Sequence, residues 1–158
     1  MEGIRARISG GSTQLREAVA AHLVEAGAEI VEDGPSVVVV LAAVSAELDD
    51  AGEAVAGGLL GPSAQLQRAH GEFGPSGGRV VVVVGDPTDG TIASRAGAAA
   101  ARSLVASLAV EWAHRTTFAT VSCGDGADAA AVARACAFAV DAPAGTTVEM
   151  GGAASAST

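Results

Sequence analysis

Residues 77–87, with the sequence GGRVVVVVGDP, decide the fold of this chain. Two glycines provide a turn, five consecutive valines follow at residues 80–84, and the run ends at Asp86 and Pro87. Five β-branched residues between two turn signals are typical of a strand buried on both faces, as in the centre of a parallel sheet. In such a sheet, ligands bind beyond the carboxyl ends of the strands. The residues after this strand are therefore the first candidates for a functional site.

The rest of the sequence alternates predicted strands with predicted helices. Short apolar or alternating runs predict strands at residues 4–9, 28–31, 37–41, 80–84, 118–121 and 146–150. Helical periodicity predicts helices at residues 12–25, 45–60, 64–70, 91–114 and 127–140. The second helix is expected to begin at Ser45 and to break or kink at Pro62. This order predicts one doubly wound α/β domain over residues 1–150, with a mostly parallel sheet of about six strands and a small-residue tail at 151–158.

Composition and charge exclude several classes of partner. The chain has 158 residues, a net charge of −9, nine Arg and no Lys, so we expect neither nucleic acid nor an anionic membrane as a partner. No apolar run reaches the roughly 18 residues of a membrane span, and the N-terminus lacks a signal-like apolar region, so a cytoplasmic protein is expected. Cys123 and Cys136 have no zinc-ligand or CxxC spacing, which favours buried hydrophobic residues over a disulfide or a reactive thiol.

Several stretches, taken in order, resemble the short-chain dehydrogenase/reductase family. SGGSTQLR at residues 9–16 stands where that family has TGxxxGxG, and TIASRAGA at 91–98 falls on its Tyr-x-x-Ser-Lys-Ala-Ala run. LVASLAVEWA at 104–113 resembles the family's long interface helix, and TTVEMGG at 146–152 resembles its closing strand. The segment between the family's second and fourth strands is missing. The resemblance therefore implies a Rossmann-like fold that is shortened between the second and third strands of this chain.

The resemblance also implies that the catalytic residues have been lost. In the family, Tyr donates a proton to the carbonyl and Lys lowers the pKa of that Tyr. Thr91 and Arg95 stand at these two positions, and the chain contains no Tyr and no Lys. A Thr hydroxyl is a far weaker acid than a phenol, and Arg keeps its proton at working pH. The position of the catalytic Ser falls near Asp86, so we expect no carbonyl reduction by this chain alone.

The cofactor-binding pattern is incomplete as well. Gly10 and Gly11 are kept, but Gln14 and Arg16 replace the second and third glycines, which let backbone approach a pyrophosphate. Asp33 lies about twenty residues further on, near where a ribose-binding acid belongs, although an acidic turn after a strand is the favoured explanation. We therefore interpret these residues as vestigial and expect no cofactor, with NAD(P) binding kept as an alternative.

Loop carboxylates offer a further alternative. Asp86, Asp89, Asp125 and Asp128 follow two predicted strands that can be neighbours, and carboxylates are ligands for hard metal ions. Aspartates in loops are more often helix caps and turn formers. We therefore predict no metal site.

The long helix at residues 91–114 carries a broad apolar side, formed by Ala98, Ala101, Leu104, Val105, Leu108 and Trp112. In the resembled family this helix and the preceding one pack against a second subunit as a four-helix bundle. The resemblance thus implies a non-catalytic subunit, a pseudoenzyme, that assembles with itself or with an active dehydrogenase-like or other enzyme subunit. Two alternatives stay open. The apolar residues could cover only this chain's own sheet, or the crevice near Gly10, Ala42, Asp86 and Thr91 could bind a nucleotide or acyl-CoA, or carry out another chemistry.

Overall fold

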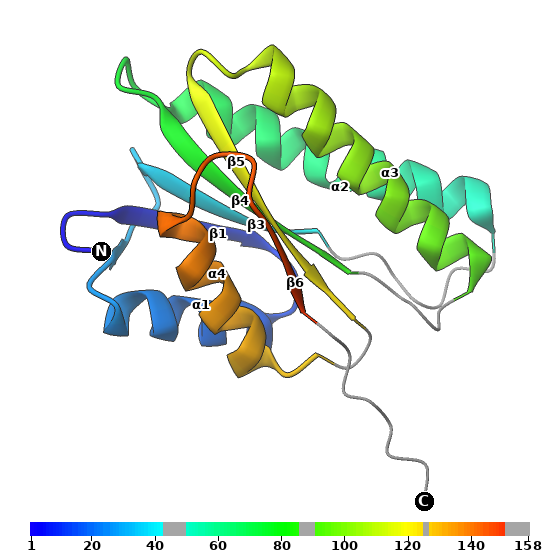
Figure 1. Cartoon of the computed structure of the whole chain (residues 1–158), viewed down its shortest axis with the longest axis horizontal. Coiled ribbons are helices and arrows are strands. Elements are labelled where there is room, and N and C mark those ends of the chain that lie inside the picture. The colour runs from blue at the N-terminus through cyan, green and yellow to red at the C-terminus, as the bar shows by residue number, and fades with distance from the viewer. Residues whose placement is uncertain (43–49, 86–90, 125–126, 151–158) are drawn as a thin grey trace, which may run out of the picture.

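The computed structural model describes residues 1–42, 50–85, 91–124 and 127–150. They form one six-stranded parallel sheet in the order β2-β1-β3-β4-β5-β6. The strands are β1 (Arg5–Gly10), β2 (Glu29–Ile30), β3 (Val37–Ala42), β4 (Gly78–Gly85), β5 (Thr116–Cys123) and β6 (Thr147–Met150). The helices are α1 (Thr13–Glu25), α2 (Ala51–Glu72), α3 (Ile92–Glu111) and α4 (Ala129–Asp141). Helices α1 and α4 cover one face and α2 and α3 the other, which confirms the doubly wound fold (Figure 1).

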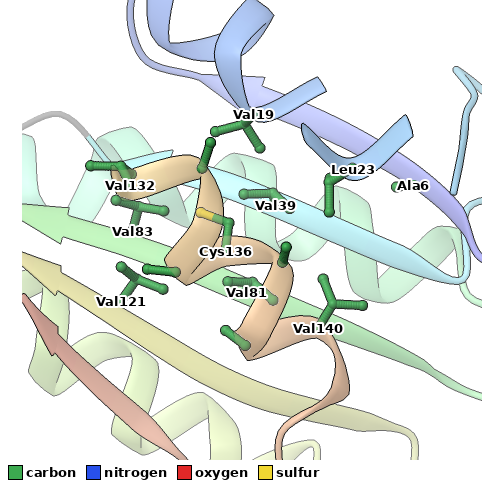
Figure 2. Close-up of a cluster of buried hydrophobic side chains, with 14 of the residues drawn as sticks. Ala6, Val19, Leu23, Val39, Val81, Val83, Val121, Val132, Cys136 and Val140 are labelled. Atoms are coloured by element: carbon green, nitrogen blue, oxygen red, sulfur yellow. The ribbon is translucent and has the colours of Figure 1, made fainter. Parts of the chain in front are cut away.

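The valine strand β4 lies inside the sheet and is buried on both faces. Val81 and Val83 pack into the core beneath α1 and α4, whereas the other three valines pack beneath α2 and α3. Figure 2 shows the first of these cores, in which Cys136 of α4 lies close to the sheet. Cys136 is fully buried, and burial raises the pKa of its thiol to about 12, with a smaller contribution from Cys123. Cys136 is therefore a small core residue, as predicted, whereas the prediction that Cys123 is buried is wrong, because it is partly exposed at the end of β5.

Helix α2 differs from its prediction in two respects. It is continuous through Pro62, so the predicted break is wrong, and it begins after Asp50, whose Oδ1 accepts a hydrogen bond from Glu53 N at 2.9 Å. The predicted start, Ser45, lies outside the described residues. Proline within a helix costs about 3 kcal/mol relative to alanine. Pro62 is buried where α2 packs on α3, and this tertiary packing offsets the lost backbone hydrogen bond.

A glycine pair brings α2 and α3 into close contact. A Cβ atom built on Gly58 would lie 2.2 Å from the carbonyl oxygen of Gly97, so any side chain there would collide with backbone. The nearby residues Ala54, Ala98 and Ala101 are small and buried. The two helices therefore form a compact layer on the sheet. No described helix is long and apolar enough to cross a lipid bilayer.

The shortening of the fold is visible at β2. This strand pairs with β1 through only two residues, and residues 31–36 then lead directly to β3 on the other side of β1. Arg7 of β1 is 4% exposed and pairs with Glu72 near the end of α2, which also accepts a hydrogen bond from Arg68 Nε at 2.6 Å. Burial opposes ionisation of Glu72, but the two arginines together hold its pKa below the ordinary value. An ion-pair network therefore joins β1 to α2.

Candidate functional site

The carboxyl ends of the central strands carry two adjoining cavities of about 380 and 280 Å³. Both are lined by Ser12 and Leu15 of the first βα turn and helix, and by Gly85 and Cys123 at the ends of β4 and β5. In doubly wound sheets this is where ligands bind. Among the described residues, no charged side chain lines either cavity. The described part of the crevice therefore offers hydroxyl, amide and thiol groups but no carboxylate or ammonium group.

Gly10 and Gly11 are required by the fold itself. Their φ angles are +77° and +64°, in the left-handed region that favours glycine. A Cβ on Gly10 would lie 2.5 Å from Leu41 O, and one on Gly11 would lie 2.8 Å from Leu41 Cβ. Arg16 then ties the turn together, because its Nη1 donates to the carbonyl oxygens of Gly10 and Gly11 at 3.3 and 3.1 Å. The turn glycines thus serve the contact between β1 and β3 whether or not a cofactor binds.

The structure does not bring Asp33 to this turn. Strand β2 ends at Ile30, which pairs with Ala6 rather than with the carboxyl end of β1. The carbonyl oxygen of Asp33 is held by Arg5 Nη2 at 3.0 Å, and Arg5 is the first residue of β1. Arg5 and Gly10 are separated by about 16 Å along a strand that rises about 3.3 Å per residue. Asp33 therefore does not line the crevice, because the shortened β2 ends too early.

The side chains at the start of α3 cap the helix. Thr91 is the N-cap residue, and its Oγ1 accepts a hydrogen bond from Ser94 N at 3.1 Å. Ser94 is buried and donates from its Oγ to Thr91 O at 2.9 Å. Arg95 is exposed, and neither Thr91 nor Arg95 lines the two cavities. Thr91, at the predicted Tyr position, therefore has a structural role as a helix cap, and Arg95, at the predicted Lys position, is exposed at the surface.

The structure describes only one of the four loop aspartates that the sequence offered as metal ligands. Asp86, Asp89 and Asp125 lie outside the described residues. Asp128 is the N-cap of α4, where its Oδ2 accepts from Ala131 N at 3.2 Å. Within the described ranges, no group of three His, Cys, Asp or Glu side chains is arranged to hold a metal ion.

The apolar side of α3 is used by the chain's own core. Ala98, Ala101 and Val105 are buried in the core where α3 packs on β4 and β5, and Leu104, Leu108 and Trp112 pack on the same cluster with part of their surface exposed. Trp112 also stacks on His70 of α2, with ring centroids 4.3 Å apart and an interplanar angle of 17°. Three of these six residues therefore have almost no surface left for a partner. The alternative left open by the sequence, that they cover this chain's own sheet, accounts for their burial.

Different apolar residues point outward from the same two helices. Leu60 of α2 is 73% exposed and Val110 of α3 is 81% exposed. Around them, residues 54–67 of α2 and 103–110 of α3 contain no charged side chain, in a chain in which 17% of residues are charged. This signal was present in the sequence. It was missed because helical periodicity alone does not tell which apolar side chains face the sheet.

Solved structures share this fold. The chain superposes on an enoyl-[acyl-carrier-protein] reductase (NADH) from Aquifex aeolicus with a TM-score of 0.71, 14% identity and 94% of each chain covered. For BdcA from E. coli the TM-score is 0.68 with 19% identity, covering 94% of this chain and 98% of that one. For a short-chain dehydrogenase from Burkholderia cenocepacia in complex with NADP it is 0.68 with 18% identity, covering 96% and 89%. No protein-family model and no curated protein matches the sequence.

These likenesses define the class of fold, which is that of the short-chain dehydrogenases. Sequence identities below 20% show a common fold but do not show a common activity, so the activity of this chain depends on its own residues.

Proposed function

We propose that this chain is a non-catalytic subunit with a short-chain dehydrogenase fold. It assembles through the outward side of α2 and α3 with a second copy of itself or with an active subunit of the same fold. The lack of Tyr and Lys in the sequence and the capping role of Thr91 support the absence of carbonyl reduction. The observation that carries the subunit role is the exposed apolar surface on α2 and α3.

This surface, called the α2–α3 face below, consists of exposed residues that recur at helical spacing: Gly57, Leu60, Gly61, Ala64, Ala99, Ser103, Ala106 and Val110. Small residues allow another helix to approach closely, and full burial of a Leu or Val side chain contributes about 1.5–3 kcal/mol. Depletion of charge is typical of the core of a protein interface. The face therefore has the composition of an interface between helices.

The proposal is tested by introducing a negative charge on the α2–α3 face. In Leu60→Glu and Val110→Glu, a carboxylate would be buried at the interface, so assembly is expected to be lost. Both side chains are mostly exposed, so the melting temperature of the isolated chain is expected to change little. Light scattering after size exclusion gives the mass, and Val24→Glu on α1, which is 53% exposed on the other side of the sheet, is the matched control.

Two outcomes would overturn the proposal. One is a monomeric mass both for the purified chain at about 100 μM and for the material isolated by native mass measurement from the producing cell. The other is an assembly that Val24→Glu disrupts as strongly as Leu60→Glu does.

A second candidate function is binding of a small molecule in the crevice at the strand ends. The two adjoining cavities of about 380 and 280 Å³ favour it, because their size and mostly apolar lining suit part of a nucleotide or an acyl group. One neighbour of similar fold is in complex with NADP, so NADPH, NADH and an acyl-CoA are the ligands to titrate by calorimetry. Tight binding by a monomeric chain would favour this function over the subunit role.

A further inference from the structure

A third cavity lies at the opposite end of the strands, where β3, β4 and β5 begin. It has a volume of about 370 Å³ and is formed by the loops that lead into these three strands. The loops before β4 and β5 run side by side, and Gly78 N donates to Arg115 O at 3.0 Å (Figure 1). The cavity is therefore made of segments that the fold holds together, and it is separate from the crevice at the strand carboxyl ends.

The ionisable side chains around this cavity are all basic. Arg79, His114 and Arg115 line it, together with the hydroxyl-bearing residues Ser76 and Thr117, and no described Asp or Glu does. This is unexpected from the composition, because the chain has 18 acidic residues against nine arginines. The pKa of His70 nearby is lowered mainly by burial and, in addition, by Arg115 and His114, while Glu111 opposes the shift. The cavity therefore has a positive local potential on an acidic protein.

Helix ends hold both guanidinium groups in place. Arg79 Nη1 donates to the carbonyl oxygens of Ala139 and Val140 at 2.9 and 3.0 Å and also to that of Ala142, where α4 ends. Arg115 Nη2 donates to Phe73 O, where α2 ends. These bonds satisfy carbonyl groups that have no partner within their helices. The guanidinium groups are thus fixed before any ligand arrives.

Capping leaves part of each guanidinium available. It uses one terminal nitrogen of Arg79 and one of Arg115, and the Nε of Arg115 is buried without a hydrogen-bond partner in the described part of the chain. The Nε of Arg79 donates to Thr117 Oγ1 at 3.4 Å, so within the described residues the second terminal nitrogen of each guanidinium is the group left to donate to an anionic oxygen. The partial negative charge of a helix C-terminus, about half an elementary charge, also neutralises only part of each arginine.

We propose that this cavity, lined by Arg79, His114 and Arg115, is a binding site for a small phosphate-bearing molecule. Guanidinium groups bind phosphate oxygens through paired hydrogen bonds, and the hydroxyl of Ser76 adds a neutral donor. The net charge of −9 would repel a long polyanion such as nucleic acid, whereas a single phosphate group experiences mainly the local potential. The site is independent of the subunit role.

The test is calorimetric titration of the full chain with inorganic pyrophosphate and with glycerol 3-phosphate at low salt. Ser76 is exposed in the loop before β4, so Ser76→Glu places a carboxylate at the cavity without disturbing the core, and Ser76→Gln has the same size without the charge. We expect Ser76→Glu to weaken binding by about tenfold or more, and Ser76→Gln by less than about twofold. Arg134→Gln on α4 changes the net charge by the same amount as Ser76→Glu and should leave the affinity unchanged.

Each outcome is decisive. Binding of pyrophosphate alone identifies an inorganic ligand, and tighter binding of glycerol 3-phosphate identifies an organic phosphate; both support the site. No binding of either probe at millimolar concentration overturns it. Equal affinities of Ser76→Glu and Ser76→Gln, or an equal loss in Ser76→Glu and Arg134→Gln, also overturn it, because phosphate would then bind elsewhere or through net charge.

Discussion

Replacing Gly58 with alanine tests whether backbone contact between α2 and α3 fixes the geometry of the α2–α3 face. The new Cβ would lie 2.2 Å from Gly97 O and 3.0 Å from Gly97 C, both backbone atoms that no side-chain rotation can move away. An ordinary contact needs about 3.4 Å or more, so the helices would have to separate by roughly 1 Å at this point. Small buried neighbours such as Ala98 would then lose their contacts.

The expected magnitude follows from two opposing effects. Alanine is favoured over glycine within a helix by about 1 kcal/mol, whereas overpacking a tight core costs about 1–3 kcal/mol and occasionally more. The clash is with backbone, so the upper part of that range applies, and Gly58→Ala should lower the free energy of unfolding by about 1–2 kcal/mol. Gly57 has no atom within 4 Å of a built Cβ, so Gly57→Ala should raise it by about 0.4–1 kcal/mol.

Urea denaturation measures both variants, with circular dichroism and the fluorescence of Trp112 as probes. Trp112 is the only tryptophan in the chain and lies at the end of α3, so it reports directly on the packing of that helix. The two variants should differ by about 1.4–3 kcal/mol, which corresponds to about 3–12 °C in melting temperature at this chain length. The denaturation is repeated at two protein concentrations about tenfold apart, because a change in assembly makes the measured stability depend on concentration, whereas a change in the packing of the single chain does not. A Gly58→Ala variant as stable as the wild type would refute the close contact.

Two further predictions concern the partly buried Glu72 and the buried Cys136. The pKa of Glu72 is lower in the folded chain, so its contribution to stability is present above the unfolded pKa and is lost as the pH falls through the folded pKa. Glu72→Gln should therefore lower the free energy of unfolding by about 1–3 kcal/mol at pH 7. In urea denaturation, the difference in this free energy between the wild type and Glu72→Gln should be smaller at pH 3.5 than at pH 7. An equal difference at both pH values would argue against the ion pair. Because burial raises the pKa of Cys136 to about 12, its thiol should resist iodoacetamide at pH 8 until urea unfolds the chain, and intact mass should show at most one adduct on the native protein. Two adducts on the native protein would contradict this.

The predicted strands and most helix starts came from short-range signals and agree with the structure. The valine run predicted a strand buried on both faces, and Ser12 was a candidate N-cap; its Oγ accepts from Leu15 N at 3.2 Å. The continuity of α2 through Pro62 was not predictable in this way, because the packing that compensates for the proline comes from α3, far away in the sequence. The place of Asp33 was missed for a similar reason. Counting residues from Gly10 does not reveal that β2 ends after two residues.

The sequence by itself determined the class of fold and the absence of Tyr and Lys, because hydrophobic periodicity and residue identity are local properties. It also contained the valine strand around which the sheet is built. Only the tertiary structure decided which apolar side chains of α3 are left for a partner. The apolar side of this helix is broad because it covers both the sheet and α2, so the predicted interface residues Ala98, Ala101 and Val105 are buried within the chain, whereas Val110 is exposed. Periodicity gives the width of an apolar surface, but the neighbours that cover it are set by long-range packing.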